Sequence, residues 1–209
     1  MEQSLSQAIR GGNMGQISRL LMSGVDVNAL DERGWSPLMH AVFMGNPHIV
    51  KMLLNAGANQ YSRNKYGRTY LTQAARFGHA AVAKVLLDWG LKKDARDKAG
   101  QTPLIYAARK GHTDVINVLL KAGDDINGTD RHGRTPLMHA IDLLQYESVR
   151  FLVEQGANRS LKNKFGQTAY DYAEKWKDMS LIRLLGAPQV IVKSNANCDA
   201  MAHIMELER

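Results

Sequence analysis

The residue types that most often carry out catalysis do not fall into a catalytic pattern in this sequence. The 209 residues contain no HExxH, no CxxC pair, no phosphate-binding GxxxxGK and no GxSxG. Such motifs fix metal ligands, phosphates or a nucleophile at a workable spacing. Cys198 is the single cysteine, and no compelling base stands beside it. The sequence therefore predicts a non-catalytic protein, with no catalytic residue, no metal site and no cofactor.

Basic side chains, in contrast, recur at a fixed interval that favours binding. The row begins at Glu32 and continues in steps of 33 residues with four cations: Lys65, Lys98, Arg131 and Lys164. Further cations stand close to these in the sequence: Arg63, Arg96, Lys162, Arg68 and Arg134. Solubility would be served by charges of both signs. A repeated excess of one sign therefore predicts a surface that attracts an acidic partner.

The interval between these cations is the length of a unit that repeats along the chain. The stretch from Asp97 to Thr129 shares its pattern with the stretches before and after it, without insertion or deletion. The residues that mark the unit are Gly100, Thr102, Pro103, Leu104, Ala107, Gly111 and Gly123. A strict period of 33 residues predicts a solenoid, in which each unit packs only on its neighbours.

Each unit carries the signals for two short helices. Thr102-Pro103 predicts a helix start, because the hydroxyl can cap the helix and the missing N–H of proline costs nothing in the first turn. Gly111 ends this helix, and Thr113 begins a second one with a wide apolar stripe. Gly123 stands where a helix ends in left-handed geometry. The polar segment that follows predicts a projecting hairpin.

With this motif and this period, the chain resembles the ankyrin repeat family from about Ser4 to Gly186. The resemblance implies an all-α fold: an ankyrin-repeat solenoid of stacked helix-turn-helix units with projecting β-hairpin loops. One departure concerns the histidine that directly follows Thr-Pro-Leu in the family. In this chain His40 and His139 stand one residue later.

The resemblance also implies where the basic row lies. Its cations fall on or beside the tips of the hairpin loops, together with Trp35 and Tyr66. A second group falls at the exposed ends of the first helices, on the concave face: Phe43-Met44, Arg76-Phe77, Arg109-Lys110, Asp142-Leu143 and Lys175-Trp176. Interleaved apolar and basic residues predict a binding groove. The alternative is that Phe77, Leu143 and Trp176 are partly buried between units and the charges are merely solvated.

The same register divides the chain into an ankyrin repeat domain at residues 1–186 and a linker with a short helical tail at 187–209. The domain comprises an N-terminal cap (1–30), four full repeats (31–63, 64–96, 97–129 and 130–162) and a C-terminal cap (163–186). In the fourth repeat Leu144-Gln145-Tyr146 replaces the Gly-His turn, so we expect its first helix to run on or bend. The tail either docks on the last cap or binds a partner.

The register also argues against two local sites. His40 and His139 lie three repeats apart, and helices pack at roughly 8–10 Å, so the two imidazoles cannot share a metal ion. Gly11 to Gly15 might be a phosphate loop, but it falls where the turn between two helices belongs. His79 and His112 occupy the Gly-His turn, where the resemblance implies a structural role.

Composition places the protein in a reducing compartment. The sequence is 44% hydrophobic and 22% charged, has a net charge of +7, and shows neither a signal peptide nor an apolar run long enough to cross a bilayer. With a single cysteine we expect no structural disulfide. We expect a cytoplasmic monomer without membrane contact, or a nuclear one in a eukaryote. Secretion as an effector stays open.

The combined patterns favour a protein-protein interaction module or scaffold that binds an acidic or phosphorylated segment through its concave face and basic fingertips. The residues expected to bind this partner are Trp35, Phe43, Lys65, Tyr66, Arg68, Arg76, Phe77, Lys98, Arg109, Lys110, Arg131 and Arg134. One alternative is oligonucleotide or RNA binding, with Trp35, Tyr66, Phe77 or Phe165 stacking on bases. Another is an interaction domain of a larger enzyme or of a bacterial effector.

Overall fold

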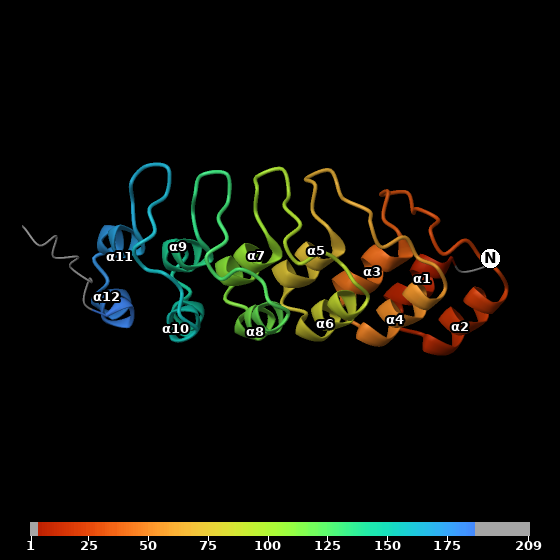
Figure 1. Ribbon diagram of the computed structural model, residues 1–209. Coiled ribbons are helices and arrows are strands. Elements are labelled where there is room, and N and C mark those ends of the chain that lie inside the picture. The colour runs from red at the N-terminus through yellow and green to blue at the C-terminus, as the bar shows by residue number, and fades with distance from the viewer. Residues whose placement is uncertain (1–3, 187–209) are drawn as a thin grey trace, which may run out of the picture.

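Pairs of antiparallel helices stand side by side in the computed structural model, which describes residues 4–186 (Figure 1). The helices are α1 (Leu5–Arg10), α2 (Met14–Met22), α3 (Pro37–Met44), α4 (Pro47–Asn55), α5 (Tyr70–Phe77), α6 (Ala80–Asp88), α7 (Pro103–Lys110), α8 (Thr113–Lys121), α9 (Pro136–Asp142), α10 (Tyr146–Glu154), α11 (Ala169–Trp176) and α12 (Met179–Leu185). Odd-numbered helices form one layer and even-numbered helices the other. The predicted all-α solenoid is confirmed. The tail predicted over 187–209 lies outside the described residues.

Long loops project from the odd-numbered layer to one side (Figure 1). We call them finger 1 (residues 23–36), finger 2 (56–69), finger 3 (89–102), finger 4 (122–135) and finger 5 (155–168). Within residues 4–186 no β-strand forms, so the expected hairpins are fingers without a regular strand pair. Each fingertip is closed by a backbone bond, for example from Asp97 N–H to the carbonyl of Gln101 at 3.1 Å.

The Thr-Pro motif begins the first helix of a pair as its chemistry predicts. The Thr102 hydroxyl accepts a hydrogen bond from the Ile105 backbone N–H at 3.3 Å, and Pro103 occupies the first helical turn. The corresponding caps of α3, α5, α9 and α11 are Ser36, Thr69, Thr135 and Thr168. Because each cap satisfies a backbone donor that the helix leaves free, all five helices start at the same register.

The core repeats with the same period. At one position of the first helices stand alanines with no exposed surface: Ala41, Ala74, Ala107, Ala140 and Ala173. At one position of the second helices stand leucines that are equally buried: Leu53, Leu86, Leu119 and Leu152. The small residues allow neighbouring helices to approach, and the leucines fill the space between the two layers. Burial of each leucine contributes about 1.5–3 kcal/mol.

The first helix of the fourth full repeat does not behave as the sequence predicted. The helix α9 neither runs on nor bends; it ends at Asp142, one residue earlier in register than α7. Leu144 occupies the register of Gly111 and takes the same left-handed conformation, with φ 55° against 78°. A residue with a Cβ enters this region at a cost of roughly 1–2 kcal/mol. Packing against the neighbouring units therefore imposes the turn without the glycine.

The turn histidines have the structural role that the sequence predicted. His79 Nε2 lies 3.0 Å from the Phe43 carbonyl, and His112 Nε2 lies 3.2 Å from the Arg76 carbonyl. Both carbonyls belong to the preceding repeat, so each imidazole donates a bond across a repeat boundary. Residues 11–13 form the turn between α1 and α2, and Met14 and Gly15 already belong to α2. Asn13 caps α2 by accepting a bond from Gln16 N–H at 3.0 Å.

One carboxylate stands at a register that is otherwise apolar. Asp124 occupies the place of Ala58, Leu91 and Ala157, which are all buried. Its Oδ1 accepts a bond from Asp125 N–H at 2.9 Å, but its Oδ2 is buried without a hydrogen-bond partner. Burial raises the pKa of Asp124 to about 6. The ionised form therefore opposes folding.

We predict that Asp124→Asn stabilises the protein at neutral pH by about 1–2 kcal/mol, because the amide keeps the Oδ1 bond and removes the buried charge. The folded-state pKa is raised, so the cost is absent below the ordinary value of 3.8 and complete above about 6. Denaturant unfolding across this range should show the gain disappear as pH falls. Asp125→Asn, next to it but exposed, is the control. An equal gain in both variants at all pH values would contradict the assignment.

Candidate partner-binding surface

The first residue of each repeat shapes its fingertip from inside. Asp97 Oδ1 accepts bonds from the backbone N–H groups of Ala99 at 2.8 Å and Gln101 at 2.9 Å. The residues at the same register are Asp31, Asn64, Asp130 and Asn163, and they make the same type of turn. Asp97 and Asp130 are buried. Their carboxylates therefore hold the turn by accepting its N–H groups, and their charges contribute little to the outer surface.

The same residue also ties its finger to the following helix. Four of these ties are present in the described repeats: Asp31 to His40 at 2.8 Å, Asp97 to the Tyr106 hydroxyl at 2.8 Å, Asp130 to His139 at 3.0 Å and Asn163 to the Tyr172 hydroxyl at 3.1 Å. Gln73 holds this register in the second repeat, and its Oε1 is buried without a hydrogen-bond partner. The row of ties is therefore broken at α5.

The tie between Asp130 and His139 affects the pKa of both residues. Burial lowers the pKa of His139, although the bond to Asp130 opposes this effect. Burial would raise the pKa of Asp130, but hydrogen bonds from His139 and from the Arg134 and His132 N–H groups hold it well below its ordinary value. A neutral imidazole that donates to an ionised carboxylate fits both directions. Across residues 4–186 no group of three potential metal ligands assembles.

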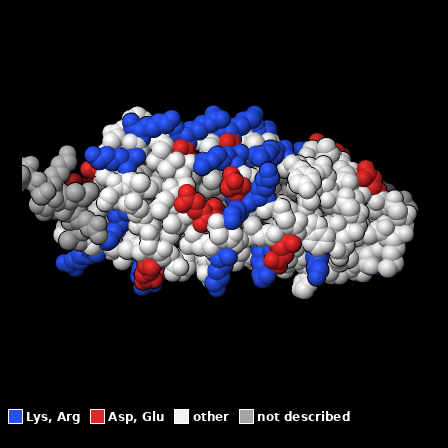
Figure 2. Space-filling view, viewed as in Figure 1, with Lys and Arg blue, Asp and Glu red and all other residues white. Residues whose placement is uncertain are grey.

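Lys65, Lys98, Arg131 and Lys164 all have exposed side chains at the fingertips. In Figure 2 lysine and arginine gather along the edge formed by the fingers, whereas the N-terminal end is largely free of them. We call these four residues the basic row. Their backbones also join the tips: the N–H groups of Lys98, Arg131 and Lys164 donate to carbonyls of the preceding finger at 3.1, 3.3 and 2.9 Å.

Two arginines that the sequence grouped with the basic row have a structural role instead. Arg63 Nη1 donates to the carbonyls of Gly67 at 2.7 Å and Arg96 at 2.9 Å. One repeat further, Arg96 Nη1 donates to the Gly100 carbonyl at 2.9 Å and also to that of Thr129. Each guanidinium therefore links its own fingertip to the next finger.

Three of the arginines predicted to bind a partner are held by the protein itself. Arg68 Nε donates to the Tyr106 hydroxyl at 2.8 Å, and its guanidinium lies 4.7 Å from the Tyr66 ring centre. Arg109 donates to Gln101 Oε1 at 2.8 Å, and Arg134 pairs with Asp130 at 3.0 Å. These side chains are partly buried. They are thereby oriented, and less of their charge is available to a partner.

The predicted aromatic residues at the N-terminal end gather into one cluster. The Phe43 ring centre lies 5.6 Å from that of Trp35 and 5.0 Å from that of Phe77, in edge-to-face contacts. Phe43 is 45% exposed, whereas Trp35 and Phe77 are partly buried. Arg76 covers the Phe77 ring at 5.2 Å. We call Trp35, Phe43 and Phe77 the aromatic cluster.

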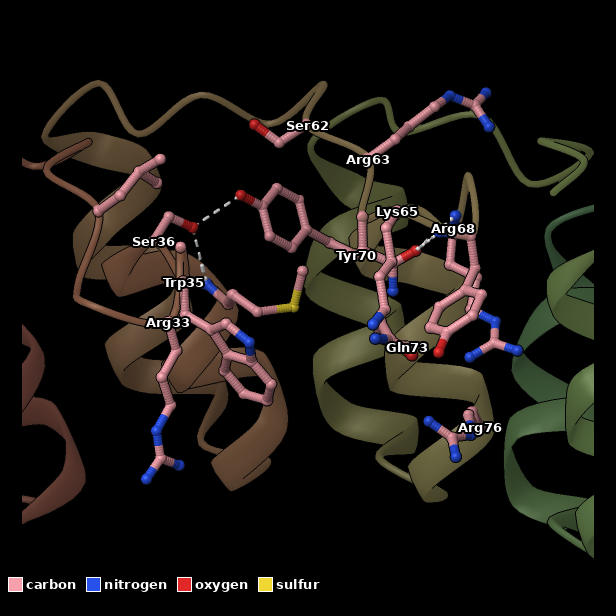
Figure 3. A pocket seen from close by; sticks show the side chains of 15 residues that line it. Arg33, Trp35, Ser36, Ser62, Arg63, Lys65, Arg68, Tyr70, Gln73 and Arg76 are labelled. Atoms are coloured by element: carbon pink, nitrogen blue, oxygen red, sulfur yellow. Dashed lines mark hydrogen bonds between the residues drawn. The ribbon is translucent and has the colours of Figure 1, made fainter. Parts of the chain in front are cut away.

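Beside this cluster, a cleft of about 640 Å³ opens between fingers 1 and 2 (Figure 3). Its cations are Arg33, Arg63, Lys65, Arg68 and Arg76, and no Asp or Glu lines it. Its apolar walls include Leu30, Trp35, Met39 and Tyr70. At the back, the Tyr70 hydroxyl bonds to Ser36 Oγ at 2.9 Å. The cleft combines positive charge with apolar surface.

Among the residues of this cleft that sequence reasoning missed are Leu30, Arg33 and Gln73. A signal for two of them was available in the repeat register. Leu30 occupies the place of Arg63 and Arg96, and Gln73 occupies the place of His40, Tyr106 and His139. Arg33 carries no such signal, since its register holds Tyr66, Ala99, His132 and Phe165.

A family model described as ankyrin repeats (3 copies) matches residues 5–97 and 90–163. The chain therefore belongs to the ankyrin repeat family. Ankyrin repeats are generally protein-protein interaction modules, and the family is typically non-catalytic. No curated protein matches the chain significantly. In the described part, no helix is long and apolar enough to cross a membrane.

The split between structural and available arginines can be tested with Arg96→Met. We predict a loss of about 1–2 kcal/mol in unfolding free energy, because two carbonyls lose a charged donor. Amide hydrogen exchange in fingers 3 and 4 should also increase. Arg131→Met is the matched control and should stay within about 0.5 kcal/mol of the unmodified protein. If Arg96→Met lost no more unfolding free energy than Arg131→Met, the bonds of Arg96 to the two carbonyls would add nothing to stability.

Proposed function

We propose that this protein is a non-catalytic, cytoplasmic interaction module that acts as a monomer and holds an acidic or phosphorylated segment of another protein. The basic row would attract the segment, and the aromatic cluster would hold its apolar side chains. This proposal narrows the general role of ankyrin repeats to a partner of one chemical class. Its support comes from the placement of charge on the fingers.

The observation that carries the proposal is a separation of charge by depth. The acids at the first position of the third and fourth repeats, Asp97 and Asp130, are buried and hydrogen-bonded. The cations that follow them directly, Lys98 and Arg131, are exposed. Their positive potential is therefore not neutralised at the surface. Such a row increases the encounter rate with an acidic partner.

Oligonucleotide binding would need aromatic rings that are free to stack on bases. In the described structure the candidate rings already have partners. Trp35 and Phe77 pack on Phe43, and Tyr66 lies beneath Lys65 and Arg68. Phe165 is the most exposed of them at 72%, and it stacks on His132. A peptide with acidic and apolar side chains fits these surfaces better than a row of bases.

We predict that the triple reversal Lys65→Glu, Lys98→Glu and Arg131→Glu slows association with acidic peptides by about tenfold or more at low salt. Suitable peptides can be selected on the full chain from a random library, and their rates followed by biolayer interferometry. The unfolding free energy should change little, because exposed charges contribute little to stability. The salt dependence of association should also be largely lost.

The control is Lys51→Glu, Lys84→Glu and Lys121→Glu, which reverses three exposed lysines on the even-numbered helices. It changes the net charge equally, away from the fingers. If both triple variants slow association to the same extent, only net charge matters and the basic row is no binding surface. Unchanged binding of the first variant at low salt would also refute the proposal.

A second prediction concerns the aromatic cluster. Phe43→Ala should increase the dissociation rate of the same peptides by about fivefold or more and leave association nearly unchanged, because an apolar anchor acts after docking. Phe165→Ala, which removes an exposed ring at the other end of the array, is the control. Equal dissociation rates for the two variants would remove the aromatic cluster from the binding surface.

A further inference from the structure

Neighbouring fingers touch along most of the array. The Lys98 N–H donates to the Tyr66 carbonyl, and equivalent bonds join Arg131 to Ala99 and Lys164 to His132. The glycines at these tips face the next finger closely. A Cβ added to Gly67 or Gly133 would lie 3.2 Å from the next backbone nitrogen, and one added to Gly100 would lie 2.8 Å away.

The tips of fingers 1 and 2 are the exception within the described array, although Asn59 N–H of finger 2 donates to Asn28 Oδ1 of finger 1 at 2.8 Å away from the tips. The equivalent bond would join Lys65 N–H to the Arg33 carbonyl, and neither group has a hydrogen-bond partner in residues 4–186. A Cβ added to Gly34 would meet nothing within 4 Å. Leu30 also stands where Arg63 and Arg96 link later fingers. Three independent contacts are therefore missing at the same boundary, and the cleft opens there.

The interior of this cleft holds an unused acceptor. Gln73 is 7% exposed, and its Oε1 has no hydrogen-bond partner. In Figure 3 this side chain lies on the same side of the cleft as Lys65 and Arg76, whereas Trp35 stands between it and Arg33. A buried carbonyl without a donor has lost its hydrogen bonds to water and gained none in return. A ligand that brings an N–H group would supply the missing hydrogen bond.

The charge of the cleft specifies the rest of the ligand. Arg63 and Arg68 are bonded to the protein, whereas the described structure contains no hydrogen bond or ion pair from the side chains of Arg33, Lys65 or Arg76. Lys65 and Arg76 lie on one side of the cleft, and a phosphate offers the charge and the oxygens to pair with both cations. A carboxylate has fewer oxygens and half the charge.

We infer that the cleft between fingers 1 and 2 is a binding site for an extended peptide that carries a phosphorylated serine or threonine. The peptide backbone takes up the free Lys65 N–H and the free Arg33 carbonyl, as an added strand does at an open edge. Its phosphate lies between Lys65 and Arg76, and one backbone N–H reaches Gln73. This inference rests on the proposed function and assigns the phosphorylated residue to one boundary of the array.

The test uses the full chain labelled with ¹⁵N and a short alanine-based peptide with one central phosphoserine. We expect saturable NMR shifts of the Lys65 amide, the Gln73 side-chain amide and the Trp35 indole. The same peptide with glutamate should bind about threefold more weakly or worse, and the serine peptide should not shift these signals. Inorganic phosphate at the same concentration should leave the Lys65 amide unshifted. An equal response to free phosphate would refute a peptide site.

The decisive variants remove equal charge from adjacent boundaries. Lys65→Gln with Arg76→Gln should weaken the phosphopeptide about tenfold or more, whereas Lys98→Gln with Arg109→Gln, one repeat further, should change binding less than about twofold. Equal weakening would overturn the inference. The proposed function would survive that result if the triple reversal of the basic row still slowed association with acidic peptides. The two ideas therefore fail separately.

A third variant tests the cleft without removing a charge. In the last unit Tyr172 of α11 holds the register of Gln73 and bonds to Asn163, whose counterpart in the second repeat is Asn64. Gln73→Tyr therefore introduces the same type of pair. The tyrosine should fill the cleft and pair with Asn64, so the melting temperature should stay equal or rise. Phosphopeptide binding should fall about tenfold or more. Unchanged binding in a folded Gln73→Tyr protein would show that the ligand lies elsewhere.

Discussion

Close packing between identical registers is the constraint on which this structure depends. Ala107 and its counterparts allow the odd-numbered helices to approach, and Leu119 and its counterparts fill the space behind them. The constraint is strong enough to place Leu144 in a left-handed turn that normally selects glycine. Local sequence preference is therefore secondary once both neighbours of a repeat are in place.

Position in the repeat also determines which charges of the fingers are buried and which are exposed. A single side chain such as Asp97 closes a tip, ties it to the following helix and is buried in doing so. Lys98, the next residue, is left exposed. A sequence that alternates acid and base at the fingertip thus folds into a surface that is mainly positive. Net charge alone would not reveal this separation.

The sequence predicted the features that follow from period alone: two helices per unit, caps at Thr102 and its counterparts, and a row of cations on one edge. It could not tell which cations are available, because the bonds of Arg63, Arg96 and Arg68 reach into other repeats. It also missed the cleft. An opening between fingers arises from absent contacts at Leu30, Gly34 and Lys65, and such an absence appears only when the repeats are compared position by position.

The arginine links from finger 2 onward have a mechanical consequence. Arg63 links the tip of finger 2 to finger 3, and Arg96 links the tip of finger 3 to finger 4. A displacement of finger 3 is therefore transmitted to both of its neighbours. Leu30 interrupts the series at its N-terminal end. Finger 1, which joins α2 to α3, still bonds to finger 2 through Asn59 N–H and Asn28 Oδ1 at 2.8 Å, but it lacks the arginine link that couples the tips of fingers 2, 3 and 4. Leu30, an apolar residue at the register of Arg63 and Arg96, therefore determines where the mechanically coupled fingers begin.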